Sequence, residues 1–189
     1  AEKINDFNQQ REAFYYLPLD CGAYIVQDKE SDIVSMRDRS NTARKNTKAD
    51  VEQHIYSCSF YNDMDRLFML KEKEMENTME TALYNDEFVV YLQPKVDLMK
   101  NEVVGAEALV RWNSPIRGLI GPNEFIPFFE RNGFIIRLDL YVFEQVCKQL
   151  RTWMEKGQKL IPISINVSRN HLFNRNFLDA YELIQQKYK

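Results

Sequence analysis

The chain has 189 residues, of which 44% are hydrophobic and 28% charged, and its formal net charge is −3. This length suffices for one ordinary domain or one and a half small ones, and the composition is that of a globular protein. The slightly acidic balance disfavours binding to duplex DNA or RNA but permits a small anionic ligand at a local site. No apolar run reaches the roughly 18 residues of a membrane span.

The cysteines indicate the cellular compartment of the protein, and the histidines limit the kinds of catalytic or metal site that it can have. Cys21, Cys58 and Cys147 are widely spaced and form no CxxC pair. They indicate free thiols in a reducing compartment, and we therefore expect a cytoplasmic location, although a longer parent protein could still be tethered to a membrane. The first ten residues lack the apolar core of a signal peptide. His54 and His171 fit neither a zinc site nor a nucleophilic triad by their spacing.

Residues 1–62 form the first predicted segment, a small α+β unit. Its apolar runs predict strands, and its amphipathic stretches predict helices. In chain order the expected elements are a helix over about 1–13, a strand over 14–26, a helix over about 31–45 and a short strand over 54–60.

A connector helix is predicted over 63–85, where apolar residues recur at approximately helical spacing. A methionine-containing stripe of this kind contributes to core packing far more often than to binding or catalysis. We therefore expect it to pack against other elements. The stripe consists of Leu67, Met75, Met79, Ala82 and Leu83.

Residues 86–189 alternate strands with helices, which favours an α/β fold built from βα units. The strand EFVVYLQPK is expected to stop at Pro94, and the strand GAEALVRW follows after a turn. The stretch GPNEFIPFFERNG predicts a short helix that starts at Pro122 and ends at Gly133. The remaining elements are a helix over about 135–156, the strand LIPISINVS and a final helix whose stripe is Leu172, Phe177, Tyr181 and Ile184.

The strand GAEALVRW, residues 105–112, carries a carboxylate within an apolar run. With the period of two of a strand, Glu107 and Arg111 share a face with Gly105 and Leu109. One interpretation is a half-exposed strand with an ion pair on its polar face, because solvated faces are common. The opposite face is wholly apolar and should pack against helices: Val104, Ala106, Ala108, Val110 and Trp112.

Polar side chains on three strands favour a second interpretation, a binding site. Gln93 and Asn166 each lie opposite an apolar face of their own strand, as Glu107 does. A lone buried Asn is usually a satisfied structural group, but a parallel α/β barrel binds its ligands at the C-terminal ends of its strands. Glu and Asn oxygens suit Mg²⁺ or Mn²⁺, and Arg111 can hold a phosphate with its fork of donors.

Four blocks of sequence, in order and spacing, resemble the first part of an EAL domain, a family named for the tripeptide at 107–109. The resemblance implies a TIM-like (β/α) barrel whose first strand is antiparallel, with residues 86–189 as its N-terminal part. The blocks are QPKVDL (93–98), GAEALVRW (105–112), GLIGPNEFIPFFERNGFI (118–135) and SINVS (164–168).

The same resemblance implies a phosphodiesterase that uses Mg²⁺ or Mn²⁺, at a two-metal site, to hydrolyse the bacterial second messenger cyclic di-GMP to linear pGpG. Carried over by position, Glu107 and Asn166 match divalent-metal ligands. Gln93, Leu109 and Arg111 match residues that bind the substrate, with Arg111 near a phosphate.

The first 62 residues resemble the C-terminal tail of a degenerate GGDEF domain. LDCGAYIV (19–26) matches a late strand of that family, and SNTARKNTK (40–48) matches a helix that ends in a basic turn. The signature loop of a diguanylate cyclase has no match in this sequence, and we expect no cyclase activity.

A TIM barrel usually needs about 250 residues, so 86–189 is expected to be an incomplete barrel. The Asp-Asp motif and the catalytic lysine of the EAL family have no match here, and no catalytic set is complete. We therefore expect an inactive fragment of a cyclic di-GMP phosphodiesterase. Two alternatives stay open: a receptor that binds cyclic di-GMP without cutting it, and a protein-interaction module.

An incomplete barrel leaves an open strand edge and exposed apolar surface. Each unpaired backbone group along LIPISINVS costs about 1–3 kcal/mol if it is buried. Ile163 and Ile165 would leave apolar surface that a polar loop cannot bury. We therefore expect the chain to self-associate.

Overall fold

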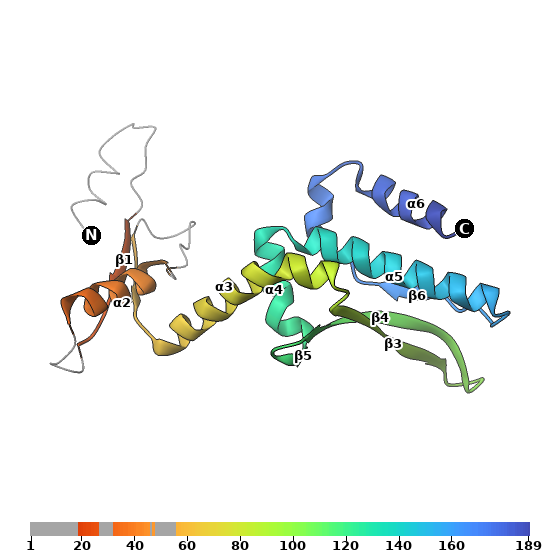
Figure 1. Ribbon diagram of the computed structural model, residues 1–189, viewed down its shortest axis with the longest axis horizontal. Helices are drawn as coiled ribbons and strands as arrows, with labels where there is room; N and C mark the ends of the chain where they lie inside the picture. The colour runs from red at the N-terminus through yellow and green to blue at the C-terminus, as the bar shows by residue number, and fades with distance from the viewer. Residues whose placement is uncertain (1–18, 27–31, 46, 48–55) are drawn as a thin grey trace. The chain divides into compact units, whose positions relative to one another are not determined.

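The computed structural model describes residues 19–26, 32–45, 47 and 56–189, and Figure 1 shows their helices and strands. The chain divides into two compact units, residues 1–73 and 74–189. The helix predicted over 1–13 and the start of the first predicted strand lie outside the described residues. Within the described part, no helix is both long and apolar enough to span a membrane.

The first unit contains a β–α–β arrangement. Strands β1 (Leu19–Ala23) and β2 (Tyr56–Phe60) pair in parallel, and helix α2 (Ile33–Lys45) connects them along the chain. Gly22 permits close packing of α2 on β1, because a Cβ at this position would lie 2.0 Å from the Ser40 carbonyl oxygen. The helix predicted over about 31–45 and both strands are confirmed in the described residues, and the first strand ends at Ala23 rather than at residue 26.

Helix α3 (Asp63–Tyr84) corresponds to the helix predicted over 63–85, and the division between the units falls within it. Met75 and Ala82 are buried, and Met79 and Leu83 pack against the core of the second unit. Leu67 is 53% exposed, so the predicted stripe is wrong at its N-terminal end, where the helix lies in the first unit.

The second unit is built on a four-stranded sheet in which β4 (Glu102–Ser114) pairs with each of the other strands. Strand β3 (Phe88–Asp97) runs antiparallel to β4, as the EAL resemblance implied for the first strand. Strand β5 (Gly118–Ile120) pairs antiparallel with the end of β4, and β6 (Ile163–Ile165) pairs parallel with its middle.

Two sequence-based expectations about these strands were wrong, and one strand was missed. Pro94 does not stop β3; it sits opposite Ala106, and the strand continues past a register shift after Lys95. Proline is tolerated there because β3 pairs with β4 alone among the described strands and so lies at an edge. Strand β5 was not predicted, and the strand expected over 160–168 is ordered as β6 at 163–165 only.

Helices α4 (Pro122–Asn132) and α5 (Ile135–Glu155) of the second unit follow the predicted start and stop signals, whereas the final helix starts later than predicted. Helix α4 begins at its proline and ends before Gly133, which has a φ of 82°. Helix α5 follows directly. A 3₁₀ turn, η1 (Arg169–Phe173), then precedes helix α6 (Phe177–Lys187), so Leu172, which is 73% exposed, is not part of the final helix.

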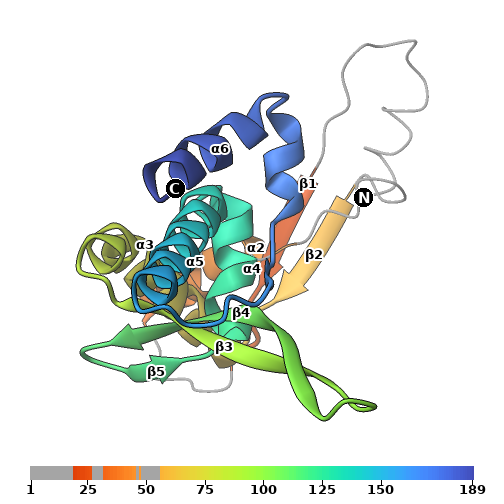
Figure 2. The same ribbon diagram turned by 90° about the vertical axis from the view of Figure 1, so that its right-hand side faces the viewer.

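Aromatic side chains fill the core between the sheet and helices α4 and α5. Phe129 is fully buried, and its ring contacts those of Phe88, Trp112, Phe125 and Phe134 at centroid distances of 4.8–6.1 Å. Helices α4 and α5 lie on one side of the β3–β4 hairpin in both views (Figures 1 and 2). The sheet therefore has one face packed on the core and one that is more accessible.

Replacing Phe129 by alanine should lower the free energy of unfolding of the second unit by about 3–5 kcal/mol, because truncation of a fully buried ring leaves a cavity. Urea unfolding followed by tryptophan fluorescence measures the change. Phe173→Ala is the matched control, since that ring is 91% exposed and its loss should change stability by less than about 0.5 kcal/mol. Equal effects of the two substitutions would contradict this assignment of the core.

Candidate functional site

Strand β4 separates an apolar face from a polar one. Ala106, Ala108 and Trp112 are buried, whereas Glu107 and Arg111 are half-buried on the alternate positions. The predicted alternation is thus confirmed over 106–112, but Val104, at 48% exposed, lies beyond the helix-covered part.

The ion-pair interpretation of this face does not agree with the geometry. Four residues of strand separate Glu107 from Arg111 by about 13 Å along the backbone. Instead, an Arg111 Nη1 N–H donates to the Val110 carbonyl oxygen at 2.8 Å. This contact orients the guanidinium group and uses one of its five N–H donors.

Glu107 and Asn166 come together from two strands. Glu107 is paired with Ser164 in the parallel β4–β6 ladder, and Asn166 follows two residues later, so its side chain continues on the same face. The Asn166 Nδ2 group donates to Glu107 Oε1 at 3.0 Å. Gln93 is the register partner of Glu107 on β3.

The pair Glu107–Asn166 offers the oxygen chemistry that a hard divalent cation prefers. The carboxylate presents two acceptor oxygens, and rotation of the Asn166 amide would turn its oxygen toward the same point. Mg²⁺ takes six ligands, often including several waters. Among the described residues, His, Cys, Asp and Glu side chains form no group of three suited to a metal. The two side chains therefore fit part of a metal site.

A pocket of about 320 Å³ adjoins the C-terminal half of β4. Its size is near the lower end of the range for small-molecule sites. Leu109, Arg111 and Asn166 line it together with the start of α4 and with Asp139 of α5. Gln93 and Glu107 do not line it, although Glu107 is connected to it through the Asn166 hydrogen bond.

Comparison with known proteins identifies the family. The model of the EAL domain matches residues 76–189. The chain belongs to the EAL domain family. This match confirms the resemblance seen in the four sequence blocks, and it begins within α3, upstream of the predicted start at 86.

Relatives of this EAL domain include cyclic di-GMP phosphodiesterases. PdeR of Escherichia coli (strain K12) is 36% identical over 113 residues, which are 60% of this chain and 17% of PdeR. NbdA of Pseudomonas aeruginosa is 35% identical over 109 residues, 58% of this chain and 14% of NbdA. The chain thus spans less than one fifth of these relatives.

A solved structure of similar fold is the cyclic di-GMP complex of the PaMucR phosphodiesterase. It superimposes with a TM-score of 0.57 at 29% identity and covers 61% of this chain and 47% of that chain. The mixed α/β fold expected from the sequence is confirmed, with EAL domains of TIM-barrel type as structural neighbours over part of the chain.

A network of buried and half-buried polar groups in this EAL domain holds the segment that carries Asn166. Asp139 Oδ2 accepts from the Ser168 backbone N–H at 2.8 Å and lies 3.1 Å from His171 Nε2. Ser168 Oγ donates to Glu130 Oε1 at 2.9 Å, so α4 and α5 both contact the segment directly after Asn166. These contacts restrain the backbone at 166–168 and thereby the position of the Asn166 side chain.

Sequence reasoning missed Asp139, although a signal was present. Asp139 follows Leu138 on the buried stripe of α5, where an unpaired carboxylate would be costly. Burial raises its pKa, and the hydrogen bond from the Ser168 N–H and the nearby His171 oppose that rise. His171 is 3% exposed and pairs with Asp139, so its role here is structural; His54 lies outside the described residues.

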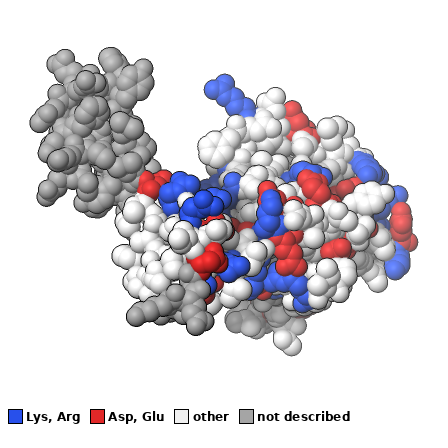
Figure 3. Space-filling view, turned by 60° about the vertical axis from the view of Figure 1, so that its left-hand side comes forward, with Lys and Arg blue, Asp and Glu red and all other residues white. Residues whose placement is uncertain are grey.

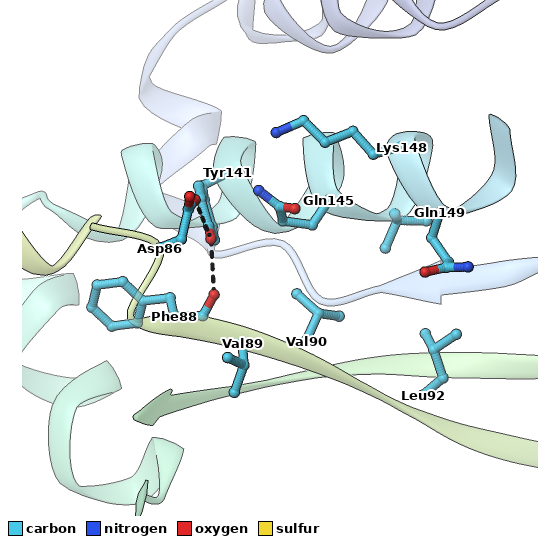
Figure 4. A pocket seen from close by; sticks show the side chains of 10 residues that line it. Asp86, Phe88, Val89, Val90, Leu92, Tyr141, Gln145, Lys148 and Gln149 are labelled. Carbon is cyan, nitrogen blue, oxygen red and sulfur yellow. Dashed lines mark hydrogen bonds between the residues drawn. The ribbon is translucent and has the colours of Figure 1, made fainter. Parts of the chain in front are cut away.

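A second pocket, of about 430 Å³, lies between β3 and α5 (Figure 4). The Tyr141 hydroxyl lies beside Asp86 and Phe88 and donates to the Phe88 carbonyl oxygen at 2.9 Å, with Asp86 Oδ1 at 3.1 Å. Burial is the main cause that raises the Tyr141 pKa. None of the predicted site residues lines this pocket. Its tyrosine connects the helix to the edge strand and is assigned to packing.

Charges of both signs are interspersed over the described surface drawn in Figure 3. This pattern agrees with the small formal net charge of −3. With so small a net charge, a local cation such as Arg111 would contribute to the attraction of an anionic ligand to the candidate site.

Asp139→Ala should leave the Ser168 N–H and His171 without their buried partner and lower the free energy of unfolding by about 1–3 kcal/mol. The same change should accelerate amide hydrogen exchange at Ser168, because the acceptor of that N–H is lost. Asp179→Ala, at an exposed position of α6, is the control and should leave the Ser168 amide unaffected. Unchanged exchange at Ser168 in the Asp139 variant would show that the network does not restrain this segment.

Proposed function

We propose that this EAL domain carries part of the catalytic site of a metal-dependent phosphodiesterase that hydrolyses cyclic di-GMP to linear pGpG. The observation that carries the proposal is the approach of Glu107 and Asn166 to 3.0 Å on the accessible face of the sheet. Support comes from PdeR, a cyclic di-GMP phosphodiesterase that is 36% identical over 113 residues.

In this proposal Glu107 and Asn166 hold a divalent cation, Mg²⁺ or Mn²⁺, with their side-chain oxygens. A bound cation of this kind activates water and offsets the negative charge that develops on the phosphoryl group. Glu107 keeps its carboxylate on the face that Asn166 shares, and the contacts of Ser168 with Asp139 and Glu130 keep Asn166 in reach.

Gln93, Leu109 and Arg111 are proposed to bind the dinucleotide. Arg111 is anchored through the Val110 carbonyl, and its planar fork suits bidentate contact with a phosphate. Leu109 presents apolar surface to the 320 Å³ pocket, which suits contact with a base or ribose. Gln93, across the ladder from Glu107, offers an amide that can donate and accept.

The parent protein is proposed to be the enzyme, and the 189-residue chain by itself is proposed to be inactive. Glu107 and Asn166 are two ligands, whereas Mg²⁺ requires six in nearly octahedral geometry. A receptor that binds cyclic di-GMP without cutting it, or an interaction module, would use the same surface. Retention of the glutamate at 107 favours the phosphodiesterase.

Glu107→Gln in the 189-residue chain should weaken Mn²⁺ binding at least about tenfold, since even changes in the outer shell of a metal site cost 10–100-fold in affinity. Electron paramagnetic resonance of free Mn²⁺ measures the binding directly. Glu102→Gln is the control, because Glu102 is an exposed carboxylate of the same strand. Equal Mn²⁺ affinity of the two variants would remove Glu107 from the metal site.

No pGpG should form when the 189-residue chain is incubated with cyclic di-GMP and Mg²⁺ or Mn²⁺, as followed by chromatography of the nucleotides. Turnover that Glu107→Ala abolishes would show that the residues present suffice for catalysis. In the longer parent protein, binding of cyclic di-GMP without turnover would favour the receptor.

We also infer that residues 1–62 derive from the C-terminal tail of a GGDEF-like domain that precedes the connector helix. Its support is the parallel β1–α2–β2 arrangement, in which LDCGAYIV contains β1 and SNTARKNTK contains the end of α2.

The three free cysteines support a cytoplasmic location.

Self-association is proposed through a strand edge. Strand β6 has three residues and so offers a shorter edge than the sequence predicted. Strand β3 has ten residues and pairs with β4 alone among the described strands. The proposal therefore uses the free edge of β3. Light scattering across a dilution series should show a mass that rises with concentration, and Val96→Lys on β3, at a position that is 46% exposed, should lower it through charge at the edge. A monomeric mass throughout the series would contradict the proposal.

A further inference from the structure

Two cysteines of the first unit lie opposite each other on neighbouring strands. Cys21 of β1 and Cys58 of β2 are register partners in the parallel ladder. Both are exposed and free of a disulfide. Their separation along the sequence concealed this arrangement, which depends on the β–α–β crossover.

The side chains of both cysteines project away from α2. A Cβ on Gly22 would point into α2, at 2.0 Å from the Ser40 carbonyl oxygen. Because successive residues of a strand point to opposite faces, Cys21 points to the face that α2 does not cover. Its register partner Cys58 shares that face.

The spacing of the pair suits a disulfide. Neighbouring strands lie about 4.8 Å apart, and the Cα atoms of disulfide-bonded cysteines are usually 4.4–6.8 Å apart. The Cys21 thiol is the main cause that raises the pKa of the Cys58 thiol, in agreement with the ladder register that places the two cysteines opposite each other. Cys147, on α5 in the second unit, is partly buried.

We propose that Cys21 and Cys58 are a reversible redox pair that a small-molecule disulfide such as oxidised glutathione converts to an intramolecular disulfide. One cysteine thiolate attacks a glutathione sulfur, forms a mixed disulfide and releases one glutathione. The second cysteine, after loss of its proton, attacks the protein sulfur and releases the other glutathione. Two protein thiols are oxidised, and one glutathione disulfide is reduced to two thiols.

A Cys21–Cys58 disulfide would link β1 covalently to β2, the two strands that α2 connects along the chain. A cross-link between two strands restricts the unfolded state and so stabilises the β–α–β unit. Exposed disulfides are the labile ones, which suits reversible formation in a reducing compartment. The proposal does not depend on the phosphodiesterase assignment, because it concerns the other unit of the chain.

The test uses the full 189-residue chain, folded and reduced, in buffers of increasing oxidised-to-reduced glutathione ratio. Peptide mapping by mass spectrometry without reduction should show one peptide pair linked by Cys21 and Cys58. Titration with Ellman's reagent under native conditions, then after denaturation, should show loss of two of the three thiols, with Cys147 retained. Reduced glutathione should restore both.

Matched variants separate this outcome from general thiol oxidation. Cys147→Ser should form the same cross-link, whereas Cys21→Ser and Cys58→Ser should each stop at a mixed disulfide with glutathione. Separate glutathione adducts on Cys21 and Cys58 without a cross-link would overturn the proposal. A cross-link between two chains in place of the internal one would overturn it as well.

Discussion

Strand β4 is the structural constraint on which the second unit depends. It pairs with β3, β5 and β6, and its side chains alternate between a buried face and an accessible one. Trp112 and Ala108 belong to the aromatic and aliphatic core, while Glu107 and Arg111 occupy positions of the opposite face. A shift of register by one residue would move the carboxylate into the core, so the packing that stabilises the sheet also determines where the candidate site forms.

The position of Asn166 depends on packing beyond the sheet. Strand β6 ends at Ile165, and the chain then turns into η1. Asp139 and Glu130, on two helices, bind the backbone and the side chain of Ser168 and so restrain this turn. Of the two candidate metal ligands, Glu107 lies within a strand and Asn166 lies in a restrained loop. The helices that cover the core therefore also orient Asn166.

The two units of the chain carry different chemistry. The second unit brings the Glu107 carboxylate and the Asn166 amide together at 3.0 Å, and Arg111 lies on the same strand as Glu107. The first presents a pair of thiols, Cys21 and Cys58, held side by side by the parallel register of β1 and β2.

The sequence by itself determined the family, the order of most helices and strands, and the face of β4 that carries Glu107, because family motifs, periodicity and helix caps are local in the chain. It did not reveal β5, the continuation of β3 through Pro94 or the short extent of β6, since edge position and ladder length depend on strand partners. Nor did it reveal the contacts of Asp139 with Ser168 or of Cys21 with Cys58. Only the tertiary structure decided these, because each joins residues far apart in the chain whose approach follows from strand register and helix packing.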